Sequence, residues 1–266
     1  MVGGGIDAMA REGMHIDLNC DMGEGLDSDV AIFPFISSAN IACGGHAGDE
    51  DTMRRTVELA LRHGVAIGAH PSYPDRANFG RVDILGRGVS LSALPDHLHE
   101  QLLTLQSICR EFGARLQHIK PHGALYNRAA KDVEVASVIC QAIKAIDPSL
   151  FFYGLSGSEM KGQAFAAGLS FVSEVFADRT YRPDGSLTPR TEPHALVEEP
   201  AQVMQQVLKM VSAGKVDVFS VDGYPLGETA LEAETICLHG DGSHAVEFAR
   251  LIRMGLEENG AVVKSP

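Results

Sequence analysis

The sequence lacks the long apolar segments that membrane insertion requires. No apolar run approaches the roughly 18 residues of a membrane-spanning helix. The segment before Met14 contains Gly3–Gly5, Asp7 and Arg11 but no apolar stretch, so it does not have the pattern of a signal peptide. We therefore expect a cytoplasmic protein with no membrane partner, in which residues 1–13 are a disordered leader.

Basic residues are also scarce. The chain of 266 residues has 22 Lys and Arg against 35 Asp and Glu, which gives a formal net charge of −13. A nucleic-acid surface needs clustered Lys and Arg, so this balance argues against a nucleic-acid partner. The five cysteines contain no C-x-x-C pair, which indicates reduced thiols rather than a disulfide framework or a zinc cage. They are Cys20, Cys43, Cys109, Cys140 and Cys237.

Several familiar catalytic and nucleotide-binding motifs are missing. The sequence contains no G-x-x-x-x-G-K-[ST], no G-x-G-x-x-G, no H-E-x-x-H and no G-x-S-x-G. The chain therefore shows no nucleotide cradle of its own. Candidate functional residues have to be found from the order of its strands and helices.

What the sequence does contain is an alternation of short apolar runs and amphipathic segments. Seven strand–helix units in strict alternation predict a parallel sheet. The expected strands are His15–Cys20, Ala39–Cys43, Val65–His70, Leu116–Pro121, Leu150–Leu155, Leu169–Phe176 and Thr235–His239. The main expected helices are Asp49–Gly64, Ser92–Gly113, Asp132–Asp147, Ser158–Ala167, Pro200–Ala213 and Ser243–Glu258.

Polar residues on one face of the strands favour a closed barrel. Asp17, Asn19 and Asp21 share a face of the first expected strand. A sheet covered by helices on both sides should be apolar on both faces, so a polar face predicts a barrel interior that opens toward a site. We expect a single α/β domain, residues 14–266, folded as a distorted seven-stranded (β/α) barrel. An open doubly wound parallel sheet is the alternative. Residues 215–234, with a hairpin turn at Asp222-Gly223, are expected to form an insertion before the last strand.

Four histidines follow four different expected strands: His46, His70, His122 and His239. In a barrel these positions converge on one mouth. An Asp with two or three neutral imidazoles suits a catalytic zinc or manganese ion with an open position. Without a metal, the same groups can act as general acid and base. Histidines on helices or caps are expected to be structural, and these are His63, His97, His99 and His244.

Lys120 lies two residues before His122, so both side chains share a strand face. A buried Lys beside imidazoles can hold an oxyanion or a substrate carboxylate. The competing interpretation is a structural salt bridge to Asp17 or Asp21.

The loop after the sixth expected strand begins with Asp178-Arg179 and also contains Arg182 and Arg190. Such arginines can clamp a carboxylate or phosphate, or they can simply be solvated. Asp49 and Asp75, which follow the second and third strands, are expected to be caps rather than ligands.

Six motifs follow one another along the sequence: Asp17–Gly25, Ser38–Asp49, Gly68–Asp75, Phe79–Arg81, Lys120–Tyr126 and Cys237–Asp241. With them the sequence resembles the LamB/YcsF family, from about Met14 to the C-terminus. The resemblance implies the seven-stranded barrel of the glycoside hydrolase/deacetylase type. It also implies ATP-dependent opening of 5-oxo-L-proline (pyroglutamate) to L-glutamate by 5-oxoprolinase, with ATP as cofactor and companion subunits B and C as partners.

The resemblance extends to the deacetylase relatives of this fold, which hold a divalent metal on one Asp and two His. The matching positions here are Asp21, His70 and His122. The sequence departs from that pattern at Lys120, where those relatives carry an acidic residue. A lysine so close to the ligands would repel a cation. This departure points instead to an anionic substrate or a phosphorylated intermediate.

The predicted catalytic set follows from this resemblance together with the strand-end pattern. Asp21 or Glu24 would activate water. His46, His70 and His122 would transfer protons or bind a metal. Lys120 and Arg179 would hold the substrate carboxylate or a developing oxyanion. The rival functions are a stand-alone, metal-dependent carbohydrate N-deacetylase and a module that only binds substrate. The predicted catalytic residues are Asp21, Glu24, His46, Lys120, Asp178, Arg179 and His239.

Overall fold

The computed structural model describes residues 13–240 and 244–266. Its central element is a barrel of seven parallel strands, which pair in the order β1-β2-β3-β4-β5-β6-β9. β9 also pairs with β1, with Asp17 opposite Thr235, and this pairing closes the barrel. The strands are β1 (His15–Met22), β2 (Ser38–Ala42), β3 (Ala66–His70), β4 (Leu116–Ile119), β5 (Phe151–Leu155), β6 (Ser170–Phe176) and β9 (Thr235–Leu238).

The predicted barrel is therefore confirmed, and the alternative of an open doubly wound sheet is wrong. The predicted leader of residues 1–13 lies outside the described residues, apart from Gly13. The predicted helix start at Ser243 lies outside them as well. Among the described residues, no helix is both long and apolar enough to cross a lipid bilayer.

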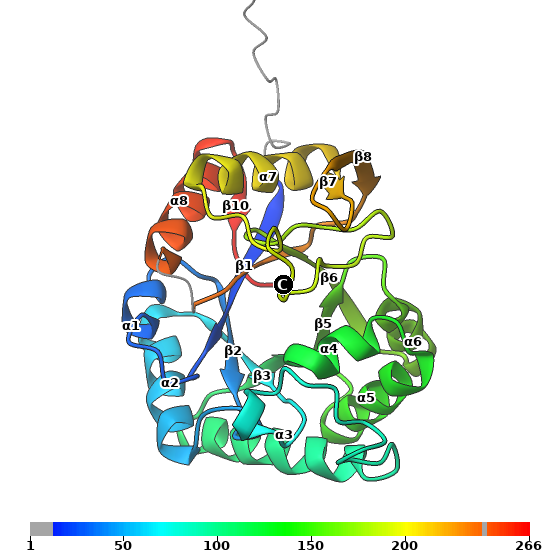
Figure 1. Ribbon diagram of the computed structural model, residues 1–266. Helices are drawn as coiled ribbons and strands as arrows, with labels where there is room; N and C mark the ends of the chain where they lie inside the picture. The colour runs from blue at the N-terminus through cyan, green and yellow to red at the C-terminus, as the bar shows by residue number, and fades with distance from the viewer. Residues whose placement is uncertain (1–12, 241–243) are drawn as a thin grey trace, which may run out of the picture.

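Helices surround the strands, as Figure 1 shows. Caps explain where several of them begin and end. The Asp49 side chain accepts a hydrogen bond from the Thr52 backbone N–H at 2.8 Å, and Gly64 ends the same helix with a φ of 67°. Asp75 caps a 3₁₀ turn in the same way, so both aspartates are caps as predicted. The helices are α1 (Asp29–Ile32), α2 (Glu50–His63), α3 (Leu94–Glu111), α4 (Gly123–Ala129), α5 (Val133–Ile146), α6 (Glu159–Ala167), α7 (Pro200–Ala213) and α8 (Ala245–Glu258), with the 3₁₀ turn η1 (Arg76–Asn78).

Four short elements were not predicted: α1, α4, η1 and β10 (Val262–Val263). Each is too short to show a hydrophobic period in the sequence. α4 matters most for the site, because its N-cap is His122 and its helix therefore begins directly at a predicted site residue.

The polar strand face lies inside the barrel, as predicted. Asp17 is buried at the start of β1, where it accepts hydrogen bonds from the hydroxyls of Ser37, Ser38 and Thr235. Burial raises the pKa of Asp17, although these hydrogen bonds oppose the shift. The alternate residues Ile16 and Leu18 belong to the apolar core. The barrel interior is thus a polar, hydrogen-bonded layer rather than a plug of aliphatic side chains.

The predicted insertion is also present. β7 (Lys215–Phe219) and β8 (Pro225–Ala230) form an antiparallel hairpin outside the barrel. Figure 1 shows this hairpin beside one end of α7.

Candidate active site

A cavity of about 570 Å³ opens where the barrel strands end. This volume is ordinary for a small-molecule site. Two predicted residues lie just behind its wall: His46 contacts Glu24, and Asp178 contacts His239. The other predicted residues line the cavity, so the structure brings the whole predicted set together. The lining ones are Asp21, Glu24, His70, Lys120, His122, Arg179 and His239.

Glu24, His46, His70 and His122 form what we call the imidazole cluster. The Glu24 Oε1 atom lies 2.9 Å from His46 Nε2 and 3.5 Å from His122 Nδ1. The His46 and His122 rings stack with a centroid separation of 3.6 Å. One ligand atom from each of the four side chains lies within 4.8 Å of all the others.

Hydrogen bonds to the backbone determine the orientation of two of these rings. His70 Nδ1–H donates to the Lys120 carbonyl oxygen at 2.8 Å, and His122 Nε2–H donates to the Phe79 carbonyl oxygen at 2.9 Å. Burial lowers the pKa of His122 well below its usual value, so the ring is neutral. A neutral imidazole has only one N–H, so the other nitrogen carries a lone pair. In His122 this nitrogen is Nδ1, and it lies 2.9 Å from His70 Nε2.

Two ring nitrogens at this distance share either a proton or a cation. The chemistry of this donor set therefore fits the divalent ion that the fold relatives imply. Asp21 Oδ2 lies 3.3 Å from His70 Nε2, so the predicted ligand Asp21 borders the same space. The ring N–H groups bonded to carbonyl oxygens match the usual arrangement of metal-bound histidines.

The loop after β3 packs closely against these rings. Phe79 has a φ of 54°, which is uncommon for a bulky side chain and costs on the order of 1–3 kcal/mol. This conformation turns its carbonyl toward His122, while its ring packs edge-on against His46 and His122. At Gly80, an added Cβ would lie 2.9 Å from the His122 ring. The loop therefore holds the imidazoles in place and leaves no room for a side chain at Gly80.

Lys120, Asp21, Glu174 and Cys237 form a second group, the lysine cluster. The Lys120 ammonium lies 2.9 Å from both Asp21 Oδ1 and Glu174 Oε1. It also donates to Cys237 Sγ at 3.0 Å. Burial alone would lower the pKa of Lys120, but Asp21 and its other neighbours raise it well above its usual value. Burial alone would raise the pKa of Asp21, but His70 and Lys120 outweigh it and lower that pKa well below the usual range.

The predicted salt bridge of Lys120 to Asp21 is therefore present, whereas the one to Asp17 is wrong because Asp17 is held by hydroxyl groups. The expected repulsion of a cation is also weaker than an unpaired lysine would produce. Two buried carboxylates contact the Lys120 ammonium and offset its charge.

Glu174 and Tyr126 were missed by the sequence analysis. Glu174 is fully buried in β6 and accepts hydrogen bonds from the Tyr126 hydroxyl at 2.7 Å and from Asn19 at 3.0 Å. A signal was available, because a lone Glu inside the apolar run Phe171–Phe176 has to find a partner.

The Asp178–His239 pair adjoins the lysine cluster, since donor atoms of His239, Asp21 and Cys237 lie within 4.8 Å of one another. His239 Nδ1–H donates to the Asp178 carboxylate, with both oxygens at 3.0 Å. Burial alone would raise the pKa of Asp178, but His239 outweighs it and the pKa lies below its usual value. When His239 donates in this way, its Nε2 is left as a proton acceptor in a ring that lines the cavity.

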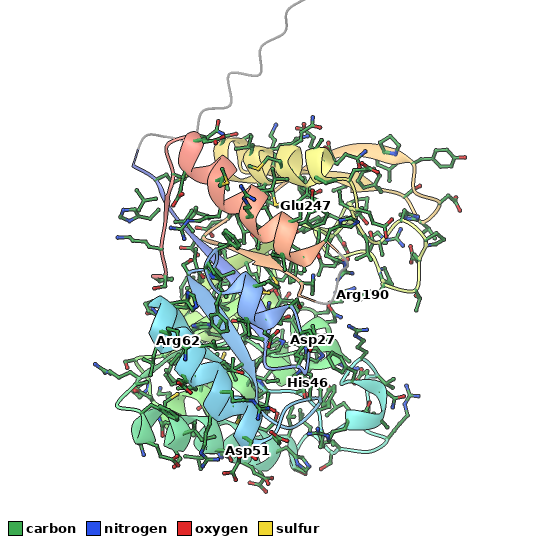
Figure 2. All side chains as sticks on the ribbon, turned by 90° about the vertical axis from the view of Figure 1, so that its left-hand side faces the viewer. Asp27, His46, Asp51, Arg62, Arg190 and Glu247 are labelled. Carbon is green, nitrogen blue, oxygen red and sulfur yellow. The ribbon has the colours of Figure 1, made fainter. Side chains whose placement is uncertain are left out.

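The arginines of the β6–α7 loop have different environments. Arg179 is buried and donates to the carbonyl oxygens of Thr188 and Ala195, and burial lowers its pKa to about 10. Arg182 is paired with Glu192. Arg179 and Arg190 line the cavity, and Arg182 does not. Figure 2 labels the exposed Arg190 on this loop and the buried His46 across the barrel mouth.

Comparison with known proteins places the chain among close relatives. The A subunit of 5-oxoprolinase from Bordetella parapertussis is 48% identical over 256 residues, which cover 94% of this chain and 98% of that protein. The protein of the same name from Bacillus thuringiensis is also 48% identical, over 257 residues and with the same coverage.

Solved structures also include a close relative of this chain. The lactam utilization protein from Thermus thermophilus has a TM-score of 0.85 and 39% identity, covering 95% of this chain and 100% of that one. An Enterococcus faecalis structure assigned to cellobiose-phosphate cleavage has a TM-score of 0.58 at 14% identity, covering 95% of this chain and 97% of that one, which shows a shared fold alone. Residues 16–266 match the LamB/YcsF family model. The chain therefore belongs to the LamB/YcsF family.

Proposed function

We propose that this chain is the A component of an ATP-dependent 5-oxoprolinase, which opens 5-oxo-L-proline to L-glutamate together with subunits B and C. The observation that carries the proposal is one cavity that combines carboxylates, imidazoles and arginines, in a chain 48% identical to proteins named as this component of 5-oxoprolinase. All five cysteines are unpaired, which supports a reducing, cytoplasmic location.

The chemistry explains the need for ATP. The carbonyl of a lactam is a poor electrophile because the ring nitrogen donates electrons to it. Transfer of the ATP γ-phosphoryl group to the carbonyl oxygen makes the ring carbon open to attack by water. The carbon–nitrogen bond then breaks, the ring nitrogen takes up a proton, and an acyl phosphate is left. A second water hydrolyses this acyl phosphate to the glutamate carboxylate and inorganic phosphate. The sequence has none of the familiar nucleotide-binding motifs, and we assign the phosphoryl transfer to the partner subunits and the ring opening to this chain.

We assign proton transfer during ring opening to His239. The Asp178 carboxylate keeps the His239 proton on Nδ1, so that Nε2 can take a proton from water and return it to the ring nitrogen. Glu24 or Asp21 would orient that water. When bound, a divalent ion held by His70, His122 and a neighbouring carboxylate would polarise the carbonyl oxygen and lower the pKa of water.

We assign binding of the substrate carboxylate to the arginines rather than to Lys120. The three protons of Lys120 already face four acceptors, namely Asp21, Glu174, Cys237 and Asn19. We therefore assign Lys120 the role of holding Asp21 in place. Arg179 and Arg190 line the cavity and would bind the substrate carboxylate, together with any phosphoryl group.

The test is reconstitution of the full chain with subunits B and C. We expect glutamate to form from 5-oxo-L-proline only when ATP and all three subunits are present. Failure of the complete mixture to release glutamate would contradict the proposal. Release of acetate from an N-acetyl sugar by the chain alone, without ATP, would instead identify a deacetylase. Full glutamate release by an assembly that carries His239→Asn and His122→Ala would leave this chain as a binding module.

A further inference from the structure

We infer that Glu24, His70 and His122 form a divalent-cation site in which His46 is the residue that positions Glu24. This ligand set differs from the one expected from the fold relatives, which uses Asp21. The inference concerns metal binding by this chain alone, so it stands or falls independently of the proposed reaction.

The distances between donor atoms carry the first step. A tetrahedral zinc ion holds nitrogen and oxygen ligands at about 2.0–2.1 Å, which places neighbouring ligand atoms roughly 3.3 Å apart. His70 Nε2 and His122 Nδ1 are 2.9 Å apart, and His122 Nδ1 and Glu24 Oε1 are 3.5 Å apart. These two separations lie close to the spacing that one ion requires, and Glu24 and His70 offer ligand atoms within 4.8 Å of each other.

The contacts of the two carboxylates separate Glu24 from Asp21. Asp21 Oδ1 accepts hydrogen bonds from Lys120 and from the Asn40 side chain, both at 2.9 Å. Its charge is thus largely offset within the lysine cluster. The donor atom of Asp21 also groups with those of Cys237 and His239, whereas the Glu24 donor atom groups with the imidazoles. Glu24 is the carboxylate that the imidazole cluster contains.

The protonation of His46 assigns its role. His46 Nε2 lies 2.9 Å from Glu24 Oε1, and among the described residues its buried Nδ1 has no hydrogen-bond partner. A buried N–H without an acceptor is more costly than an unpaired lone pair, so the proton belongs on Nε2. His46 therefore donates to Glu24, which leaves that nitrogen unable to bind an ion. Its stacking on His122 fixes the plane from which it donates.

The experiment is a zinc titration of the full chain after chelator treatment, followed by calorimetry. We expect one Zn²⁺ per chain in the wild type. His122→Ala and Glu24→Gln should each weaken binding by about 100-fold or more, and His46→Phe by about 10–100-fold, the range for residues that orient a ligand. Asp21→Asn should weaken it less than Glu24→Gln. The control is His63→Ala on the outer face of α2, which should bind within about twofold of the wild type.

Visible absorption of bound Co²⁺ separates a ligand from a positioning residue. Glu24→Gln should change the Co²⁺ spectrum because a ligand is lost, whereas His46→Phe should keep the wild-type spectrum at saturation and lower only the affinity. Thermal unfolding without metal shows which variants are folded. If His122→Ala does not fold, the isosteric Glu24→Gln variant alone tests the ligand set.

Three results would overturn the inference. The first is no Zn²⁺ binding by the wild-type chain. The second is unchanged binding in Glu24→Gln with loss in Asp21→Asn, which would restore the ligand set of the fold relatives. The third is unchanged affinity in a folded His46→Phe chain.

Discussion

The imidazole cluster and the lysine cluster are neighbours at the barrel mouth, but their buried polar groups are stabilised in different ways. In the lysine cluster every charge has a partner, because the Lys120 ammonium contacts Asp21 and Glu174. In the imidazole cluster, burial keeps His46 neutral and lowers its pKa to about 3, and ring nitrogens of His70 and His122 lie 2.9 Å apart. The first arrangement balances charges within the cluster, whereas the second brings together donor atoms that we propose bind a cation.

Asp21 connects the two clusters. One carboxylate oxygen faces Lys120 at 2.9 Å and the other faces His70 at 3.3 Å. A substitution in one cluster therefore alters the contacts of Asp21 with the other cluster. Buried polar groups therefore serve two purposes in this barrel: the lysine cluster pairs charges, and the imidazole cluster gathers donor atoms. Substitutions in one cluster at a time can distinguish these purposes.

The largest stability effect should come from removing the Lys120 charge. Lys120→Met leaves two buried carboxylates without their cation, and we expect a loss of about 3–5 kcal/mol in the free energy of unfolding, measured by urea denaturation. The double variant Lys120→Met/Glu174→Gln should recover part of that loss. The matched control is Lys161→Met, which removes a half-exposed pair with Glu232 and should cost at most about 1 kcal/mol. A loss for Lys120→Met as small as that of the control would break the distinction between the clusters.

A smaller effect should follow from filling the space beside the imidazoles. Gly80 has a φ of 62°, and an added Cβ would also lie 3.0 Å from the His46 side chain. Gly80→Ala should therefore cost about 2–4 kcal/mol in the free energy of unfolding, from the left-handed backbone and the crowded rings together. Gly86 has a φ of 79° with no neighbour within 4 Å, so Gly86→Ala isolates the backbone part at about 1–2 kcal/mol. Equal losses for the two variants would show that the imidazole cluster is not tightly packed.

The smallest of these effects concerns the loop that carries Glu24. Asp29 accepts a hydrogen bond from the Gly23 backbone N–H at 2.7 Å, and burial above all raises its pKa to about 6. The folded chain therefore keeps this proton at a pH where the unfolded chain has lost it. The resulting stability, about 2–3 kcal/mol, is complete below about pH 4 and disappears as the pH rises through 6.

Asp29→Asn should remove this component of the pH dependence. The measurement is urea denaturation of both chains at intervals from pH 4 to 7, which gives the difference in unfolding free energy at each pH. A difference that stays constant over this range would contradict the raised pKa of Asp29.

Much of the fold could be predicted because the spacing of apolar and polar residues shows which side of a strand or helix is buried. Alternation of strands and helices indicated the barrel, and the polar face of Asp17, Asn19 and Asp21 indicated that it closes around a polar interior. Strand-end positions converge in any parallel barrel, so the meeting of His70 and His122 followed from the fold alone.

The roles of individual groups could not be predicted, because they depend on contacts between distant segments. The partner of Lys120 in β6, Glu174, is 54 positions away in the sequence, and no local pattern pairs them. The acceptor of the His122 N–H is a backbone carbonyl, that of Phe79, which a sequence cannot single out. The choice between Glu24 and Asp21 as a ligand likewise depends on which carboxylate Lys120 contacts.

The central claim is that the cavity at the barrel mouth is where the ring opens. Its most direct test is the rate of glutamate release from 5-oxo-L-proline and ATP by the reconstituted assembly carrying His122→Ala, compared with His63→Ala as the control. We expect a loss of about 100-fold or more for His122→Ala, the usual cost of removing a group at the reacting centre, and a rate within about twofold of the wild type for His63→Ala. A near-normal rate for a folded His122→Ala chain would contradict the central claim.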